Sequence, residues 1–320
     1  MRRAILAAPV RLASLLAAMM LFVPAAMAQD KGTIDPKPLP PLAHPNDPGL
    51  AARELFARKL RPTAQQPRPI GFYAKGCMAG GASIPINGPT WQVMRLSRNR
   101  AWALPATVRL IERLADKARE QAGWNGILIG DMSQPRGGPM LTGHASHQVG
   151  LDADIWLTPM PNRLLSRNER EEMSAVMMVR SDRLDIEPSA WTPTHWKVIR
   201  AAALEPEVDR IFVNAAIKKA LCREAKGDRS WLHKVRPMYG HDYHFHIRLR
   251  CPAGIDGCES QAEPPPGEGC GASDFAYWFS DAVLHPKPPL KPPPPRHQLT
   301  LSELPAECRA VLNAPDKKPD

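Results

Sequence analysis

Long apolar runs are scarce in this 320-residue chain, which limits the classes of protein it can be. One apolar stretch, residues 12–23, follows Arg2 and Arg3, and residues 26–28 read Ala-Met-Ala, the small-x-small pattern that a signal peptidase cleaves. Nothing later approaches the roughly 20 apolar residues that a membrane-spanning helix needs. We therefore expect residues 1–28 to be a cleaved signal peptide and the mature protein to be exported, with no membrane span.

Closely spaced cysteine pairs are also missing. The six cysteines are scattered, and no C-x2-C pair of the zinc-finger type occurs among Cys77, Cys222, Cys251, Cys258, Cys270 and Cys308. An even number of cysteines in an exported chain favours three disulfides instead. Six cysteines allow fifteen pairings, and spacing alone does not choose among them.

No stretch interleaves lysine or arginine with aromatic residues, as a surface that stacks nucleic-acid bases would. The net charge is nevertheless +10, and loss of Arg2, Arg3 and Arg11 with the signal peptide lowers it by three, to +7. A basic surface suits an anionic polymer. Since an exported protein rarely meets nucleic acid, we expect peptidoglycan, with its free stem-peptide carboxylates, as the partner and no nucleic acid.

Proline is abundant and divides the chain. The 36 prolines cluster in residues 35–69, 264–266 and 286–295, and the last cluster predicts an extended arm. No internal repeat is visible. We expect a signal peptide (1–28), a proline-rich N-terminal arm (29–69), one packed core (70–260) and a proline-rich C-terminal segment (261–320) that disulfides tie back.

Within the core, helices and strands alternate. Helical spacing predicts a helix over residues 105–121, started by Pro105 and stopped by Gly123, and residues 126–130 predict a short buried strand. A capping box of Ser166 and Glu169 predicts a helix to about residue 179, and Pro193 begins another that ends near residue 204. Residues 208–213 read as a further strand. The pattern predicts an α+β fold, an antiparallel sheet flanked by helices.

Two further predicted strands carry unusual polar faces. Residues 151–157 alternate, with apolar side chains on one face and Asp152, Asp154 and Trp156 on the other, which predicts a half-buried strand. Residues 243–250 alternate as well, and they place His244 and His246 on one face, two residues apart. Such a strand can present two imidazoles to a common centre.

These two segments together predict a metal site. A tetrahedral catalytic zinc needs three protein ligands and one open position for water. Directly opposite side chains on adjacent antiparallel strands lie within about 5 Å, so His246 can join His147 and Asp154 around one ion. His244, two residues away on the same face, then lies beside the ion, in reach of the water.

Three segments carry a resemblance to a known family: GHASHQVGLDADIW (143–156), RIFVN (210–214) and KVRPMYGHDYHFHIRLRCP (234–252). They resemble the penicillin-insensitive murein endopeptidases, periplasmic zinc peptidases within the wider group of lysostaphin, D-Ala-D-Ala carboxypeptidases and sonic hedgehog. The similarity covers most of residues 70–312. It implies this group's core fold and hydrolysis of the D-alanyl to meso-diaminopimelyl cross-links of peptidoglycan.

The resemblance also assigns residues. It implies zinc ligands at His147, Asp154 and His246, a base at His244, and a further histidine near the metal at His144. It implies the disulfides Cys77–Cys308, Cys222–Cys270 and Cys251–Cys258. The family's second, peripheral Asp-x-x-His metal site corresponds here to Asp182-Arg-Leu-Asp185, which lacks the histidine, so the sequence does not decide whether a second metal site exists.

Some alternatives stay open at this point. A D,D- or L,D-carboxypeptidase on the same fold would use the same ligands, and a non-catalytic wall-binding module would keep the metal but has no use for His244. Asp152 and Asp131 are interpreted as orienting groups. Arg248 and Arg250 either bind a substrate carboxylate or are solvated strand charges. The number of chains that assemble is not determined by the sequence.

Overall fold

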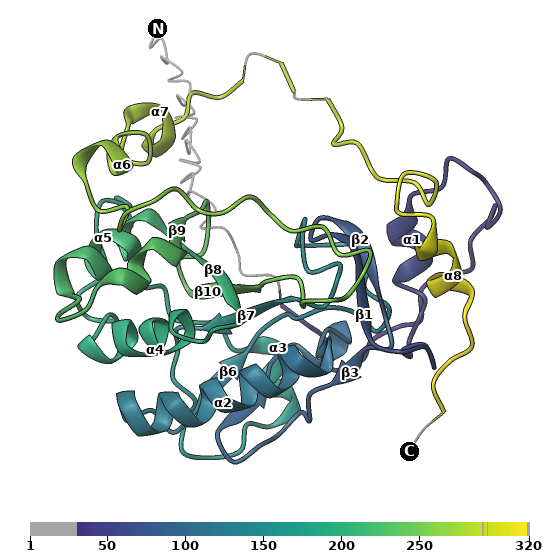
Figure 1. The fold of residues 1–320 in the computed structure, drawn as a ribbon, viewed down its shortest axis with the longest axis horizontal. Coiled ribbons are helices and arrows are strands. Elements are labelled where there is room, and N and C mark those ends of the chain that lie inside the picture. Colours follow the sequence, from purple (N-terminus) through teal and green to yellow (C-terminus); the bar gives the residue numbers. More distant parts are fainter. Residues whose placement is uncertain (1–30, 290, 293, 319–320) are drawn as a thin grey trace, which may run out of the picture.

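A six-stranded sheet lies at the centre of the computed structural model, which describes residues 31–289, 291–292 and 294–318 (Figure 1). The expected signal peptide, residues 1–28, lies outside the described residues. In order across the sheet, the strands are β4 (Trp91–Val93), β6 (Ile127–Ile129), β7 (Asp152–Trp156), β10 (His244–Leu249), β8 (Val208–Val213) and β9 (Val235–Pro237). Two small two-stranded sheets pair β1 (Arg68–Phe72) with β2 (Lys75–Ala79) and β3 (Ala82–Ser83) with β5 (Trp102–Ala103).

The helices connect and cover these strands. They are α1 (Ala52–Phe56), α2 (Pro105–Ala122), α3 (Arg167–Glu172), α4 (Pro193–Ala203), α5 (Ala215–Glu224), α6 (Ala272–Ala276), α7 (Asp281–Leu284) and α8 (Glu307–Asn313). Two short 3₁₀ helices, η1 (Leu96–Arg98) and η2 (Ser230–Lys234), lie in connections. The fold is thus α+β, as the sequence predicts.

The expectation of a purely antiparallel sheet is wrong, because the sheet is mixed. β7 pairs antiparallel with β10 and β6, and β10 with β8, but the outer pairs β4·β6 and β8·β9 are parallel. Each parallel pair is joined by a helical crossover, α2 in the first case and α5 in the second. A helix returns the chain to the same end of the sheet, so the next strand runs in the same direction.

One face of the central sheet packs on the main hydrophobic core. This core contains Ala153 and Ile155 of β7 together with Phe245, Ile247 and Leu249 of β10, and it includes the buried faces of α2 and α4. All five residues of β7 are buried, so the prediction of a half-buried strand is wrong. A central strand has neighbours on both edges, and loops cover its polar face, so its carboxylates are enclosed rather than exposed to solvent.

The longest helix and its neighbours follow the sequence closely. α2 begins at Pro105, and Gly123 ends it in the left-handed region with φ 72°, a conformation that glycine adopts without steric cost. α4 begins at Pro193 and ends one residue before Leu204, and β8 has the predicted bounds. Strong periodicity with clear end signals explains this agreement.

The helix that starts at the Ser166 capping box is shorter than predicted. The capping box is present, but α3 ends at Glu172 rather than near residue 179. Met178 instead donates its backbone N–H to Asp242 and accepts one from Glu187, each at 2.8 Å. The apolar residues after α3 are therefore extended because they pair with distant backbone, which helix propensity cannot reveal.

A second, smaller core lies between α1, α8 and the β1–β2 hairpin. It contains Phe56, Ile70, Cys77, Val311 and Leu312, among other residues. The disulfide Cys77–Cys308 crosses it, and the other two disulfides are Cys222–Cys270 and Cys251–Cys258, so the pairing implied by the family resemblance is confirmed. Helices in both proline-rich segments thus pack against the body of the protein.

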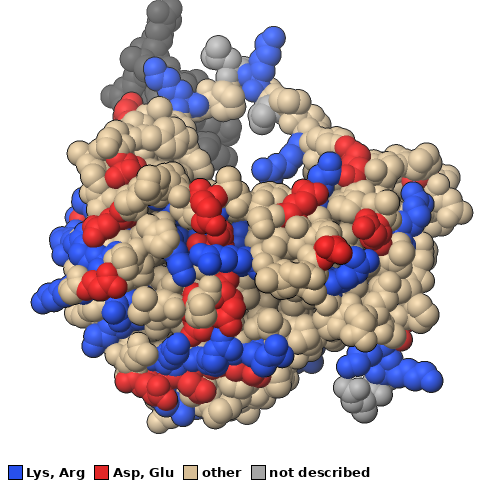
Figure 2. Space-filling view, in the orientation of Figure 1, with Lys and Arg blue, Asp and Glu red and all other residues tan. Residues whose placement is uncertain are grey.

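The described residues of the proline-rich stretch between α7 and α8 form an extended segment that arches away from the body, drawn in yellow in Figure 1. Its described residues between 286 and 295 are exposed and belong to no helix or strand, as predicted. Basic and acidic side chains are intermixed on the face seen in Figure 2. Within the described part of the chain, no helix is both long and apolar enough to cross a membrane.

The long-range disulfide should contribute more stability than the shortest one. Cys77–Cys308 closes a loop with a sequence separation of 231, whereas Cys251–Cys258 has a separation of 7. In the chain-entropy description, a longer closed loop restricts the unfolded state more. Replacing Cys77 and Cys308 together by alanine should lower the free energy of unfolding by about 2–4 kcal/mol.

The matched control is the double alanine variant of Cys251 and Cys258, which should lose less. Urea unfolding of both oxidised variants beside the parent protein measures the difference. An equal loss in the two variants, or none at the long-range pair, would contradict the entropic explanation.

Candidate active site

The polar face of the sheet brings the predicted site residues together through strand register. β7 and β10 are antiparallel neighbours, and His246 lies directly opposite Asp154 while Arg248 lies opposite Asp152. Side chains two residues apart on a strand share a face, so Asp152 and Asp154 point to the same side as His244 and His246. The register therefore places two carboxylates among two imidazoles.

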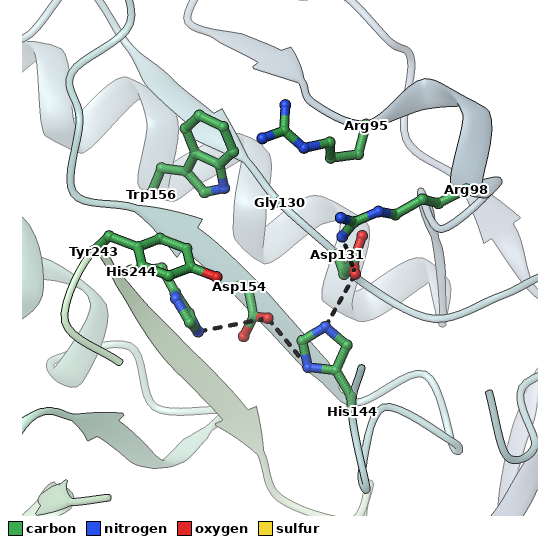
Figure 3. A pocket seen from close by; sticks show the side chains of 9 residues that line it. All are labelled: Arg95, Arg98, Gly130, Asp131, His144, Asp154, Trp156, Tyr243 and His244. Atoms are coloured by element: carbon green, nitrogen blue, oxygen red, sulfur yellow. Dashed lines mark hydrogen bonds and ion pairs between the residues drawn. The ribbon is translucent and has the colours of Figure 1, made fainter. Parts of the chain in front are cut away.

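Asp154 is the centre of the arrangement (Figure 3). Its Oδ1 lies 3.5 Å from Nε2 of His147 and 3.3 Å from Nδ1 of His246. Its Oδ2 lies 3.5 Å from Nδ1 of His144 and 3.7 Å from Nε2 of His244. Four imidazoles from two distant parts of the chain thus surround one buried carboxylate.

These side chains fit a metal ion. Among the described residues, His144, His147 and Asp154 form a group whose ligand atoms all lie within 4.8 Å of one another. Both ring nitrogens of His147 and Oδ1 of Asp154 are buried without a hydrogen-bond partner. Since buried polar atoms in folded proteins nearly always have partners, these atoms are suited to bind a cation.

His246 is oriented toward the same point. Its Nε2 is hydrogen-bonded to Oδ1 of Asp152 at 2.8 Å, which leaves Nδ1 facing Asp154. A metal-binding histidine typically donates its other ring N–H to a carboxylate in this way, which sets the tautomer. The group found in the described residues (His144, His147 and Asp154) and the set predicted from the sequence (His147, Asp154 and His246) therefore differ only in the third candidate ligand.

Asp152 holds three groups of the site at once. Its side chain is fully buried, and it accepts hydrogen bonds from Nε2 of His246 (2.8 Å), Nε of Arg248 (2.8 Å) and the backbone N–H of His147 (3.0 Å). The predicted orienting role of Asp152 thus has a structural basis.

The backbone at His147 is strained and held from both sides. His147 has φ 66°, a conformation uncommon for a residue other than glycine. Its N–H donates to Asp152, and its carbonyl accepts from the hydroxyl of Ser133 at 2.6 Å. Strained backbone of this kind concentrates at functional sites, where the surrounding contacts maintain it.

Asp131 organises the other side of the site. Its Oδ2 accepts hydrogen bonds from Arg98 (2.9 Å) and Arg100 (2.8 Å), and it lies 3.0 Å from Nε2 of His144. His144 is therefore held by a carboxylate through Nε2, while its Nδ1 faces Asp154, an arrangement that parallels the contact between Asp152 and His246.

The local electrostatics set the protonation states. Burial alone would raise the pKa of Asp154, but His147, His244 and His144 outweigh it and hold that pKa well below its ordinary value. Burial lowers the pKa of His244 to about 3 and that of His246 to about 4. Ionised carboxylates and neutral imidazoles are the forms that bind a divalent metal.

His241 and the two predicted arginines, Arg248 and Arg250, differ in their surroundings. His241 lies beside His244, with ring centroids 4.8 Å apart, and its Nδ1 contacts the carbonyl of Tyr239. Arg248 is buried, bonded to Asp152 and stacked over Tyr73 at 4.2 Å, so it is no solvated charge. Arg250 is half-exposed, with Nε 3.8 Å from Asp209.

The stretch that corresponds to the family's second metal site is occupied by ion pairs. Asp185 lies 3.2 Å from Lys219 and 3.0 Å from Arg223, and Asp182 pairs with Arg180. Basic side chains thus take the positions around both carboxylates that a cation would need.

The sequence reasoning missed several residues that line the pocket at this site. Arg95, Arg98, Trp156 and Tyr243 lie around the pocket that opens beside Asp154 (Figure 3). Trp156 lies in the same strand as Asp154, and Tyr243 directly precedes His244. Both could have been proposed from these positions. The arginines come from η1 and the residue before it, and their one sequence signal is the basic run of residues 95–100.

The chain is similar in sequence to known proteins. The sequence model of the penicillin-insensitive murein endopeptidase family matches residues 69–313. The penicillin-insensitive murein endopeptidase of Klebsiella pneumoniae subsp. pneumoniae is 42% identical over 265 residues, 83% of this chain and 93% of the relative. Those of Yersinia enterocolitica (44% over 253 residues, 79% and 88%) and Haemophilus influenzae (41% over 254 residues, 78% and 84%) are similarly close.

Removing the charge of Asp152 should weaken the site without deleting any residue that faces Asp154. In Asp152→Asn, the groups that donate to the carboxylate lose their negative partner, and the tautomer of His246 is no longer enforced. Loss of such a supporting carboxylate typically lowers metal affinity by about 10- to 100-fold. Zinc titration in competition with a chelator measures the change.

Asp182→Asn is the control, because Asp182 is an exposed carboxylate paired with Arg180. It should leave metal affinity unchanged. Equal affinities for the parent and Asp152→Asn would show that the carboxylate does not support the metal site.

Proposed function

This chain belongs to the penicillin-insensitive murein endopeptidase family, and we propose that it cleaves peptidoglycan cross-links with a zinc ion bound by His147, Asp154 and His246. The protein is a murein endopeptidase, a peptidase that acts on peptidoglycan. The bond we propose is the amide between D-alanine of one stem peptide and meso-diaminopimelate of another. The proposed location is the periplasm, supported by the three disulfides, which require an oxidising compartment.

The observation that carries the ligand assignment is the set of buried, unpaired atoms around Asp154. His147 and Asp154 belong to both candidate ligand sets, and their unpaired atoms face each other. His246 is the proposed third ligand because Asp152 leaves its Nδ1 directed at Asp154. His144 stays close enough to join the ion as a further ligand. His147 and Asp154 form an H-x6-D pattern, and His244 and His246 form an H-x-H pattern. Both patterns support our proposal that this chain has the core fold of the lysostaphin, D-Ala-D-Ala carboxypeptidase and sonic hedgehog group.

The donor set fits zinc better than the other common divalent ions. Two or three imidazoles with one carboxylate suit zinc, whereas calcium and magnesium prefer oxygen ligands alone. When bound, zinc acts as a Lewis acid on the scissile carbonyl and makes a hydroxide nucleophile available near neutral pH.

His244 is the proposed acid–base residue. It lies at the opposite oxygen of Asp154 from His147 and His246, and its Nδ1 has no hydrogen-bond partner among the described residues. A neutral imidazole at this position can accept a proton from the attacking water and donate it to the departing amine nitrogen. A non-catalytic binding module would gain nothing from such a group.

The supporting carboxylates keep these residues in place. Asp152 holds the Nε2–H of His246, and Asp131 holds His144, so each imidazole presents the ring nitrogen that faces Asp154. Arg248 and Arg100 neutralise these two carboxylates within the buried region. The chain's own contribution is thus a preset geometry in which little has to move during the reaction.

Cleavage of purified muropeptides tests the function directly. Cross-linked dimers should become monomers, an excess of chelator should abolish the reaction, and added zinc should restore it. Penicillin should not inhibit, since no serine is acylated. Mass spectrometry identifies the products. Release of terminal alanine would indicate a carboxypeptidase, and unchanged dimers would indicate a binding module, so either outcome contradicts the proposal.

Two alanine variants separate the ligand from the base. His246→Ala removes a proposed ligand, so zinc content and activity should fall together. His244→Ala should keep its zinc and its melting temperature but lose about 10²- to 10⁴-fold in rate, the usual contribution of general acid–base catalysis. Zinc analysis and cleavage assays on the same preparations measure both.

If His244→Ala loses zinc as His246→Ala does, then His244 is a ligand and the assignment is wrong. If it keeps both zinc and activity, the base is another residue, with His241 or Asp152 as the next candidates. His144→Ala belongs in the same series, since a loss of zinc equal to that of His246→Ala would make His144 the third ligand.

A further inference from the structure

A small pocket opens directly beside the metal cluster. It is lined by Arg95, Arg98, Asp154, Trp156, Tyr243 and His244, among others, and its cavity volume is about 40 Å³. Figure 3 shows the two arginines on one side, Trp156, Tyr243 and His244 on the other, and Asp154 between His244 and His144. Asp154 and His244 line this pocket and are also the proposed metal ligand and acid–base residue. A group bound in the pocket therefore lies next to the scissile amide.

The arginines are built into the structure rather than free on the surface. Arg95 is 3% exposed, donates to the carbonyls of Arg170 (2.7 Å) and Met173 (2.8 Å), and has its guanidinium 5.1 Å from the centre of the Trp156 ring. Arg98 donates to Asp131, and its side chain is 17% exposed. Both positive charges are therefore held in fixed positions at the pocket.

The charge balance favours an anion. The acidic side chains at the pocket are Asp131 and Asp154. Asp131 forms ion pairs with arginines, and Asp154 belongs to the group that could hold a metal ion. Asp131 faces Arg100 as well as Arg98, and the charge of Asp154 is directed at the metal cluster. With a divalent ion in place, the pocket carries a net positive charge, which attracts an anion.

The size of the pocket limits what the anion can be. The volume corresponds to about three water molecules at roughly 10–15 Å³ each, enough for a carboxylate but too small for a sugar ring. In the proposed cross-link, the leaving nitrogen is attached to the D-centre of meso-diaminopimelate. That same carbon carries a free carboxylate, two bonds from the nitrogen.

We propose that this pocket binds the free D-centre carboxylate of meso-diaminopimelate, with Arg98 and Arg95 as the residues that recognise it. The inference rests on the proposed function and deepens it by naming the specificity determinant. A carboxylate held at this place fixes the position of the scissile amide relative to His244. It also explains selectivity, since an internal bond of an ordinary peptide has no free carboxylate beside its leaving nitrogen.

The test compares two cross-linked dimers that differ in this one group. One has the D-centre carboxylate free, and in the other it is converted to the carboxamide. The zinc-loaded parent enzyme should cleave the acid with a kcat/KM about 10- to 100-fold higher, the usual effect of a charge-assisted hydrogen bond. Arg98→Gln should cleave the acid more slowly and the amide at nearly the parent rate. The ratio of its kcat/KM values for acid and amide should therefore fall toward one.

Two further variants complete the test. Arg98→Lys retains a positive charge and should keep part of the preference, which also guards against a folding defect in Arg98→Gln. Arg163→Gln removes an arginine that pairs with exposed Glu169 outside the pocket, and it should keep the full preference. Zinc content and melting temperature of each variant establish that the site is intact.

Three outcomes overturn the proposal in distinguishable ways. If the parent enzyme cleaves acid and amide equally well, the pocket does not recognise the carboxylate, although the proposed function stands. If Arg98→Gln slows both substrates equally, Arg98 acts only by holding Asp131. If the parent cleaves neither dimer, the proposed function itself fails, and the pocket assignment fails with it.

Discussion

The buried carboxylate of Asp152 is the interaction on which the rest of the site depends. It contacts a loop residue, His147, and two residues of the neighbouring strand, His246 and Arg248. Through these contacts it fixes the strained backbone of His147 and the ring orientation of His246. The proposed ligands His147 and His246 lie beside Asp154 because Asp152 holds both of them there.

Burying this much charge has a stability cost, and the surroundings offset it. Asp131, Asp152 and Asp154 are all buried, and an unpaired carboxylate in such a place is strongly destabilising. Arg98 and Arg100 compensate Asp131, and Arg248, stacked over Tyr73, compensates Asp152. Asp154 has imidazoles around it in place of an arginine. Of these three carboxylates, the one without a guanidinium partner is the one in the group that could hold a metal ion.

The disulfide-linked small core also reaches the site. Gln148, next to His147, accepts a hydrogen bond from the backbone of Gly76 (3.1 Å) and donates to the carbonyl of Ala74 (2.9 Å), both in or beside β2. Cys77 in β2 is bonded to Cys308 in α8. The C-terminal helix is thus connected through one hairpin to the loop that carries a proposed ligand, which gives the proline-rich segments a structural role.

The sequence by itself determined the chemistry and much of the local structure. Alternation placed Asp152 and Asp154 together on one face of their strand, and His244 and His246 together on one face of theirs, because a strand has a period of two. The ends of α2 and α4 followed from proline and glycine, whose backbone preferences act locally. The family resemblance supplied the disulfide pairing, which spacing alone left among fifteen choices.

Tertiary structure decided what depends on distant backbone. The parallel outer strands follow from crossovers, and α3 stops early because the residues after it pair with positions 187 and 242. The pocket arginines were not identified as site residues, because η1 reaches the site only through contacts made after folding. Sequence patterns report which way a side chain points on its own element, whereas the identity of its neighbours is set by long-range packing.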